Sequence, residues 1–529
     1  MPAKLRLLPG GLTSNGEDLP KQGPSVEQIE KELYAQFAAV VAQARTSGAL
    51  FAVFEKELWA QMLGLGRLLV VLFLASREQR QQAQGPQRMM LDGRWYSRNQ
   101  AQPRNLNTLF GVVRYFRTYM RGESGQGHYP LDAELGLLQD RLSIGLLSLG
   151  ARLATMMSFA KAQGLLRWFL GQAPSTEVLE QSVLGLGRRT SAWFEQAPAP
   201  QGDGEVLIIQ VDSKGAPTAT EQELARRRGP RTRKRAKAAS PRHRGRLDRR
   251  RRGKKPRRKK GDKSKNARLA TVVVLYTLHR EKHQGRWVLC GPLNQWTYAS
   301  FAPKRHAFAV ARREADKRGF SRGSGRVVQV LTDGDEDLAC YTRELFPEAI
   351  HTIDVMHVIE SLYKAGECLY AEGSPELSCW VEEQKARLYG GQEAQIVAQL
   401  RRHLRAIPQT GPGNKGRRSR LNQAITYLDK RLPQMNYQEL LKRDLEIATG
   451  IVEGTVKNLI GARFDFGGSR WIRERAEALL QLRCIERNGH WDSFIQWGHD
   501  QDVEALRRGA RIRVQQTTPG PLPTVEAAA

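Results

Sequence analysis

The chain is poor in cysteine and has no closely spaced cysteine pair. No C-x-x-C motif occurs among its five cysteines, which lie at positions 290, 340, 368, 379 and 484. A disulfide framework and a cysteine-rich zinc site both depend on closely spaced cysteines, so the sequence argues against both. This cysteine usage fits a reducing compartment.

Long hydrophobic runs are also lacking. The N-terminal stretch MPAKLRLLPGGL has no apolar core of the kind that a signal peptide contains. The most apolar stretch, residues 62–75, is too short to span a bilayer and carries Arg67. We therefore expect a soluble cytoplasmic protein without a membrane partner.

Acidic residues are outnumbered. The 529 residues include 84 Lys and Arg against 54 Asp and Glu, a net charge of +30, and the window 226–268 alone carries +22. This window has too few apolar residues to pack, so we expect a disordered basic arm that binds phosphates. A localisation signal, an RNA-binding tail and nonspecific binding remain alternatives. A flexible Lys/Arg run contacts phosphates rather than base edges.

The remaining chain is apolar enough to build a core, since 40% of all residues are hydrophobic. Its length suggests three or four domains. Shifts in composition and periodicity predict the following division: a disordered tail over 1–24, a mainly helical region over 25–195, an α/β part over 196–372 with the disordered basic arm inserted at 221–268, a helical insertion over 373–445, a second part of the α/β domain over 446–500, and a disordered tail over 501–529.

Apolar residues at helical spacing predict helices over 26–83, with Ser25 as N-cap and Gln28 as its capping-box partner. Residues 107–119 alternate like a strand or hairpin, and 131–195 return to helical spacing. Further on, apolar runs predict strands, separated in part by helical segments: EVLIIQVD, ARLATVVVLYTL, GRWVLCGPL, RVVQVLTD and AIHTID. We therefore expect an α/β (α+β) fold with a sheet of mixed direction.

Two of these strands end in an acid, at Asp212 and Asp333, and Glu453 opens a later helical stretch. Functional groups of open α/β sheets collect where strands end. Three carboxylates suit Mg²⁺, which prefers oxygen ligands, and two such ions can serve phosphodiester chemistry. The alternative is that each Asp merely caps the following turn or helix, which is plausible for Asp333 before GDED.

The stretches VLTDGDEDL, HTIDVMHVIE and GIVEGTVKNLIGARFDFGGSRWIRERAEALLQLR resemble DDE-type insertion-sequence transposases, most closely the ISKra-type group. The resemblance covers about 130–495. It implies a ribonuclease H-like catalytic domain with Asp212, Asp333 and Glu453 as the catalytic metal ligands. It also implies two Mg²⁺ (or Mn²⁺) ions, DNA as the partner (terminal inverted repeats and target), a homodimer or higher oligomer, and a nucleoid-associated bacterial protein.

The sequence departs from the family at three places. The segment before PLDAELGL carries no cysteine pairs, the residues after the second Asp, DEDLACY, lack an aromatic pair, and the basic arm is unusually long. A subdomain that is stabilised by a bound zinc ion is therefore not expected before residue 130.

Several residues form a predicted supporting set. His357 follows Asp354 at i+3 and is expected to orient a catalytic acid or contact a phosphate, while Asp354 is also a candidate N-cap. Lys457, at i+4 from Glu453, either pairs with that acid or contacts DNA. The remaining predicted DNA contacts are Arg463, Arg470 and Trp471; Trp471 either stacks on a base or belongs to the core.

The resemblance implies a DNA transposase that cleaves the ends of an insertion sequence and joins them to a target. In this interpretation the helical region over 25–195 binds the DNA ends, and the parts over 196–372 and 446–500 form the catalytic domain. Two rivals remain open. One is a catalytically inactive, domesticated DNA-binding protein, and the other is a ribonuclease H-like nuclease without strand transfer.

Overall fold

The computed structural model describes residues 23–123, 125, 127–219, 267–465 and 470–508. The expected tail over 1–24 and the basic arm therefore lie almost entirely outside the described residues. The chain divides into two compact units. The first contains described residues 23–189 and 489–508, and the second contains 190–488.

The first unit begins with two long helices, α1 (Val26–Thr46) and α2 (Phe51–Gln84). The capping box at the start of α1 is confirmed: the Ser25 hydroxyl accepts from the Gln28 amide, and the Gln28 side chain accepts from the Ser25 amide at 2.9 Å. By length and composition α2 is apolar enough to cross a membrane, which for a single helix is weak evidence. Only 11% of its most apolar window is buried, and Leu74 packs into the core of this unit.

A four-stranded antiparallel sheet follows, in the order β1-β2-β3-β4. Its strands are β1 (Arg88–Leu91), β2 (Arg94–Thr108), β3 (Gly111–Gly122) and β4 (Gly127–His128). The hairpin expected over 107–119 is confirmed, but the sheet is larger than the mainly helical expectation allowed. Polar residues such as those of RNQAQPRN fill much of β2, so its sequence lacks a strong strand signal.

The remaining helices of this unit are α3 (Pro130–Leu135), α4 (Ile144–Met156), α5 (Phe159–Leu170), α6 (Thr176–Gly187) and α19 (Trp491–Arg507). Helix α19 packs against α3 and α4. A disordered tail was expected from residue 501, but the helix continues because Trp491, Phe494 and Leu506 are all buried on one face.

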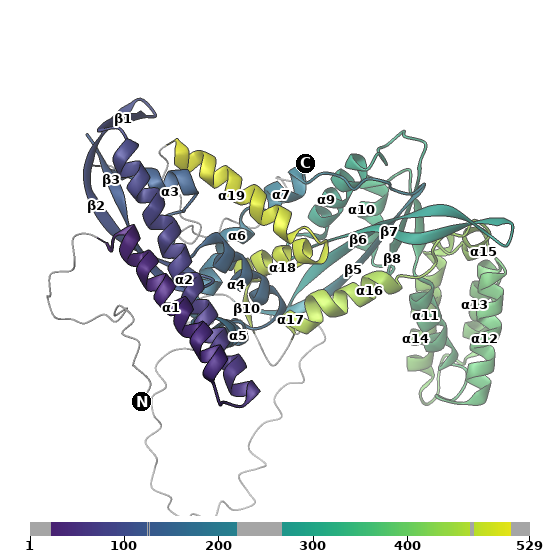
Figure 1. Ribbon diagram of the computed structural model, residues 1–529. Helices are drawn as coiled ribbons and strands as arrows, with labels where there is room; N and C mark the ends of the chain where they lie inside the picture. The colour runs from purple at the N-terminus through teal and green to yellow at the C-terminus, as the bar shows by residue number, and fades with distance from the viewer. Residues whose placement is uncertain (1–22, 124, 126, 220–266, 466–469, 509–529) are drawn as a thin grey trace, which may run out of the picture. The chain divides into compact units, whose positions relative to one another are not determined.

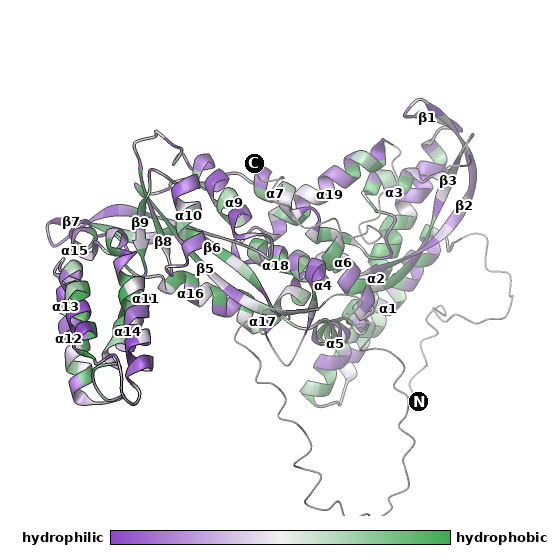
Figure 2. Ribbon diagram, turned by 180° about the vertical axis from the view of Figure 1, so that it is seen from behind, coloured by the Kyte–Doolittle hydropathy of each residue, from purple (hydrophilic) through white to green (hydrophobic). Residues whose placement is uncertain are grey.

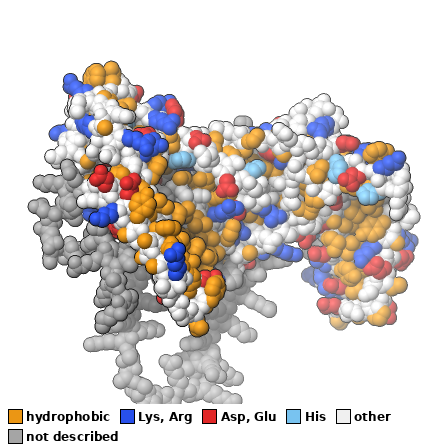
Figure 3. Space-filling model, viewed as in Figure 1, with side chains coloured by type: hydrophobic (Ala, Val, Ile, Leu, Met, Phe, Trp, Pro, Cys, Tyr) orange, Lys and Arg blue, Asp and Glu red, His pale blue; other side chains and the backbone are white. Residues whose placement is uncertain are grey.

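Large hydrophobic side chains remain exposed on α1 and α2. Figure 3 shows hydrophobic atoms along these helices. The exposed set includes Tyr34, Phe37, Phe51, Trp59 and Leu69. Exposed apolar surface of this extent is uncommon on monomeric proteins.

The second unit is built on a mixed sheet in the order β7-β6-β5-β8-β9, with β10 pairing β5 (Figure 1). Strands β5, β6 and β7 are antiparallel, whereas β8, β9 and β10 run parallel to their neighbours. The expected α/β class with a mixed sheet is confirmed. The bounds are β5 (Val206–Ala219), β6 (Ala267–His283), β7 (Arg286–Ser300), β8 (Val327–Thr332), β9 (Ile350–Ile353) and β10 (Trp471–Ile472).

Helices cover this sheet because most residues of its central strands are buried and apolar; Ile208, Ile209 and Val274, for example, have no exposed surface. Helix α9 packs on β6 and β7, α18 on β7, and α16 on β5 and β6. The bounds are α7 (Thr190–Gln196), α9 (Lys304–Lys317), α10 (Glu336–Leu345), α11 (Val355–Gly366), α16 (Gly450–Val456), α17 (Ala462–Phe464) and α18 (Arg473–Arg487).

The stretch expected as a helical insertion over 373–445 is helical. It contains α12 (Pro375–Tyr389), α13 (Glu393–Ala406), α14 (Asn414–Asp429), the 3₁₀ turn η2 (Leu432–Gln434) and α15 (Tyr437–Lys442). Figure 2 shows both hydrophobic and hydrophilic residues on α12 and α13, as amphipathic helices have. The basic, Gly-rich sequence of residues 411–420 favours a loop, but α14 already begins at Asn414.

Candidate active site

The first two predicted acids lie on neighbouring strands. In the parallel pair β5 and β8, Val211 is opposite Thr332, so Asp212 and Asp333 follow at the same edge of the pair. The sequence suggested that the strand ends at Asp212, but it does not. Strand β5 continues for seven residues to Ala219, because residues 213–217 still pair with β6 and residues 218–219 pair with β10. Asp212 therefore projects from a strand with fixed pairing rather than from a loop.

Asp333 lies in a tight turn after β8. Its Oδ1 accepts from the Asp335 amide at 2.9 Å, and the intervening Gly334 has a φ of 87°. Tyr427 of α14 donates to the Asp333 carbonyl at 3.2 Å, and Arg431 donates to the Gly334 carbonyl at 2.9 Å. The helical insertion over 373–445 therefore stabilises this turn.

The structure shows which acid caps helix α10. Asp335, rather than Asp333, is the N-cap of α10, and its side chain accepts from the Asp337 amide. Lys304 pairs with the same Asp335 carboxylate at 2.5 Å. The Asp333 carboxylate thus caps the turn after β8 through the Asp335 amide, as the alternative allowed, but it is not the cap of α10.

Buried Asp354 and half-buried His357 form a pair at the start of α11. Asp354 is the N-cap, as the sequence suggested, and its side chain accepts from the Met356 amide at 3.1 Å. The same carboxylate bonds His357 Nδ1 at 2.7 Å and accepts from the Thr449 hydroxyl at 2.8 Å. Asp354 has no exposed surface.

These contacts set the charge of the pair. The hydrogen bond to Asp354 raises the pKa of His357 to about 8, against the effect of burial. The pKa of Asp354 is lowered by His357, Thr449 and the Met356 amide, which together outweigh its burial. At neutral pH the pair therefore consists of an imidazolium and a carboxylate.

Glu453 comes from a remote part of the chain, and buried glutamines on the sheet fix the segment that leads to it. Gln210 of β5 accepts from the Val452 amide at 3.0 Å and donates to the Ala448 carbonyl at 3.2 Å. Gln329 of β8 donates to the Glu446 carbonyl at 2.6 Å. The segment before α16 is thus fixed across neighbouring strands, which positions Glu453 on the first turns of α16.

The predicted acids and His357 form one electrostatic cluster. Burial raises the pKa of Asp212. The negative charges of Asp333 and Glu453 raise it further, whereas the positive charge of His357 lowers it. Among the described residues, the ligand atoms of Asp354, His357 and Glu453 lie within 4.8 Å of one another, a set that does not contain Asp212 or Asp333. The site therefore holds two strand acids beside a tight Asp–His–Glu group.

This donor set fits hard divalent cations. Carboxylate oxygens are the ligands that Mg²⁺ and Mn²⁺ prefer. Burial is the main cause of the raised pKa of Asp212, and repulsion by Asp333 and Glu453 adds to it; a bound cation would relieve that repulsion. The residues that would hold such ions are Asp212, Asp333 and Glu453.

The predicted DNA contacts divide into two groups. Lys457, in the π-helical turn η3 (Lys457–Gly461), and Arg470 are exposed. Arg463 is only 7% exposed, and its guanidinium lies 4.7 Å from the centre of the Trp471 ring. Trp471 also packs 5.0 Å from Phe464 and donates to its carbonyl. Lys457 and Arg470 are thus presented to solvent, whereas Arg463 and Trp471 contact each other.

The sequence interpretation missed the residues that position the acids. A signal existed for two of them, because Gln210 and Gln329 interrupt apolar strands, and a buried polar side chain must find partners. No local signal pointed to Thr449 or Tyr427, whose partners lie 95 and 94 residues away in the chain.

A scan against models of known protein families found no match to this chain. A search of curated proteins also found none.

Proposed function

We propose that the chain is a DNA transposase of the DDE type. It would bind the ends of an insertion sequence, hydrolyse a phosphodiester there and join the freed end to target DNA. The second unit would be a ribonuclease H-like catalytic domain, a proposal that the mixed sheet with acids on adjacent central strands supports. The observation that carries the proposal is the meeting of Asp212, Asp333 and Glu453, from three remote segments, in one charged cluster.

The three acids would bind two Mg²⁺ or Mn²⁺ ions between them and the scissile phosphate. Such ions would supply the charge that activates an attacking hydroxyl and stabilises the leaving oxygen. The chain's own contribution is positioning. Gln210 and Gln329 fix the segment before Glu453, and the turn at Gly334 fixes Asp333.

His357 has a separate role in this proposal. Asp354 holds its Nδ1 and keeps the ring protonated near neutral pH, so the cation faces the acids and would contact a non-bridging phosphate oxygen. Its charge also offsets part of the repulsion among the acids before metal and DNA bind. Asp354 thus acts through His357.

The proposed DNA path follows the exposed cations. Lys457 lies one helical turn beyond Glu453, and Arg470 lies just before β10, which pairs with β5. The basic arm connects β5 to β6, so it leaves from and returns to the strand pair that carries Asp212. Its charge would hold the DNA backbone in a sequence-independent way. Two element ends must be held together during transposition, so we propose a homodimer or higher oligomer on DNA.

The test is a cleavage and strand-transfer assay on duplexes that carry the DNA flanking the coding sequence. Asp212→Asn, Asp333→Asn and Glu453→Gln should each lower Mg²⁺-dependent cleavage by more than about 100-fold, since each removes a metal ligand. DNA affinity, measured by fluorescence anisotropy, should change little. Glu360→Gln is the matched control, because it removes one exposed negative charge near His357 without touching the acids.

The same assay separates the rivals. Cleavage without joined products would indicate a nuclease, and DNA binding without any cleavage would indicate an inactive DNA-binding protein. Full activity in any one of the three acid variants would refute the assignment of that acid.

A further inference from the structure

The β6–β7 hairpin carries a second group of metal-ligating side chains, on a face that the proposed active site does not use. The hairpin closes with a two-residue turn in which Gln284 and Gly285 have φ values of 48° and 85°. Positive φ at both positions is typical of a type I′ turn. The first ten residues of β7 are exposed or only half-buried, so this outer part of the hairpin has little packing from other elements.

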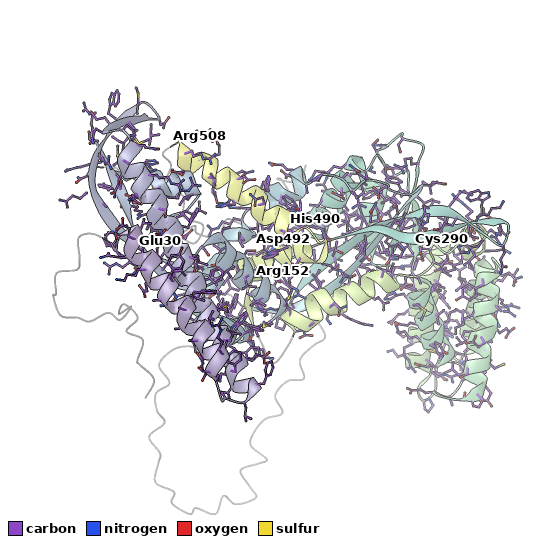
Figure 4. All side chains as sticks on the ribbon, viewed as in Figure 1. Glu30, Arg152, Cys290, His490, Asp492 and Arg508 are labelled. Carbon is purple, nitrogen blue, oxygen red and sulfur yellow. The ribbon has the colours of Figure 1, made fainter. Side chains whose placement is uncertain are left out.

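Strand geometry places four ligand-type side chains on one face of this outer part. His279, Glu281 and His283 alternate along β6 and therefore point the same way. Cys290, labelled in Figure 4, belongs to β7, and the strand register places it directly opposite His279. A free thiol, a carboxylate and two imidazoles thus occupy neighbouring positions across two strands.

The distances suit one ion. Among the described residues, ligand atoms of Glu281, His283 and Cys290 lie within 4.8 Å of one another. His283 Nε2 is 3.3 Å from Glu281 Oε2. Two ligands at about 2.0–2.1 Å from a tetrahedral zinc ion are about 3.3 Å apart, so this edge of the site is already formed.

His279 has a different relation to the group. Its Nε2 lies 2.6 Å from Glu281 Oε1, which is a hydrogen-bond distance and too short for two ligands of one ion. Ligating carboxylates are commonly held by such a partner on their other oxygen. His279 therefore positions the Glu281 carboxylate.

We propose that Glu281 Oε2, His283 Nε2 and Cys290 Sγ bind a Zn²⁺ ion at the outer part of the β6–β7 hairpin, with water in the fourth position. The donor set selects the metal, because thiolate and imidazole are ligands of zinc, whereas Mg²⁺ prefers oxygen alone. The ion would join the two strands where packing is least. A two-stranded hairpin without other support is only marginally stable, so the cross-link would stiffen it.

The test uses full-length, metal-free protein and titrates it with Zn²⁺, and in parallel with Co²⁺ as a spectroscopic probe. One equivalent of Co²⁺ should produce the sulfur-to-cobalt charge-transfer absorption of a thiolate ligand, and Zn²⁺ should abolish it. Cys290→Ser should remove this absorption, and His283→Asn should weaken Zn²⁺ binding at this site by more than about 100-fold. Cys340→Ser is the matched control, because Cys340 is an exposed thiol elsewhere, and it should behave as wild type.

The thiolate signal separates this site from the acid cluster, which contains no cysteine. Glu453→Gln should therefore leave the absorption unchanged. No thiolate absorption in the wild type, an absorption that persists in Cys290→Ser, or an unchanged Zn²⁺ affinity in His283→Asn would each overturn the proposal. Circular dichroism of each variant checks that the fold is retained.

Discussion

Asp354→Asn tests the charge arrangement of the candidate active site in a direct way. Asparagine caps helices about as well as aspartate, so α11 should keep its N-cap. The substitution removes the negative charge that holds His357 protonated. Burial then lowers the pKa of the imidazole against only the charges of Asp333 and Glu360, so the pKa of His357 should fall from about 8 toward its ordinary 6.5.

The magnitude follows from that shift. A change from about 8 to 6.5 corresponds to about 2 kcal/mol. Because 34% of the His357 side chain is exposed, solvent screening reduces the expected contribution to stability to about 1 kcal/mol. The folded-state pKa of His357 lies above its unfolded value, so this contribution is fully present below pH 6.5 and is lost as the pH rises through 8.

Asp354 sets the lower limit of the pH range in which the Asp354–His357 pair stabilises the fold. Its pKa is lowered in the folded state, so its contribution is present above its ordinary value of 3.8 and is lost as the pH falls through the lowered folded-state pKa. Both contributions are therefore present between about pH 5 and 6.5.

The assay combines two measurements. Urea denaturation of wild type and Asp354→Asn at pH 6 and pH 9 should show a difference in unfolding free energy that is about 1 kcal/mol larger at pH 6. NMR titration of ring-labelled histidines, with His357→Gln for assignment, should give the pKa values directly. His306 serves as an internal control, since burial lowers its pKa to about 4 independently of Asp354. A His357 pKa that stays near 8 in Asp354→Asn would refute the reasoning.

Three further predictions follow from the positioning contacts and the charge. Gln210→Leu leaves the Val452 amide without its buried partner and should lower the unfolding free energy by about 2–4 kcal/mol, measured by urea denaturation, while also lowering cleavage; an unchanged stability would contradict the bridging role. Gly334→Ala places a Cβ 2.6 Å from Tyr427 Oη at a positive φ, so it should destabilise the protein by about 1–3 kcal/mol and weaken Mn²⁺ binding; wild-type thermal stability would contradict the close approach. Replacing residues 226–264 by a Gly-Ser linker should weaken binding to all DNA sequences and flatten the salt dependence of the affinity; an unchanged slope would show that the arm is not on DNA.

Much of the mixed sheet of the second unit was predictable because its central strands are buried on both faces. Runs such as VLIIQV and RVVQVLT are mostly apolar, as is typical of strands that are buried on both faces. Strands β5 and β8 are found at these positions. Strand β2 was missed because much of its sequence is polar, and the continuation of β5 beyond Asp212 was missed because SKGAPTA has weak strand propensity. Pairing with neighbours decides both segments, and no local pattern encodes it.

The acids were easier to predict than their supports. Asp212 and Asp333 follow conspicuous apolar runs, so position alone selects them. Thr449 and Tyr427 are ordinary residues on helical or irregular segments, and only the fold brings them to Asp354 and Asp333. The burial of Arg463 against Trp471 was likewise beyond a local pattern, since an arginine near a Gly-rich segment is typical of phosphate contacts as well.

The most direct test of the central claim is to replace Mg²⁺ by Fe²⁺, in the presence of DNA, and to map where hydroxyl radicals generated at the bound iron cut the polypeptide. If Asp212, Asp333 and Glu453 hold the ions together, cuts should occur near all three positions, and excess Mg²⁺ should suppress them. Cuts at other places only, or cuts that Mg²⁺ does not suppress, would contradict a shared metal site.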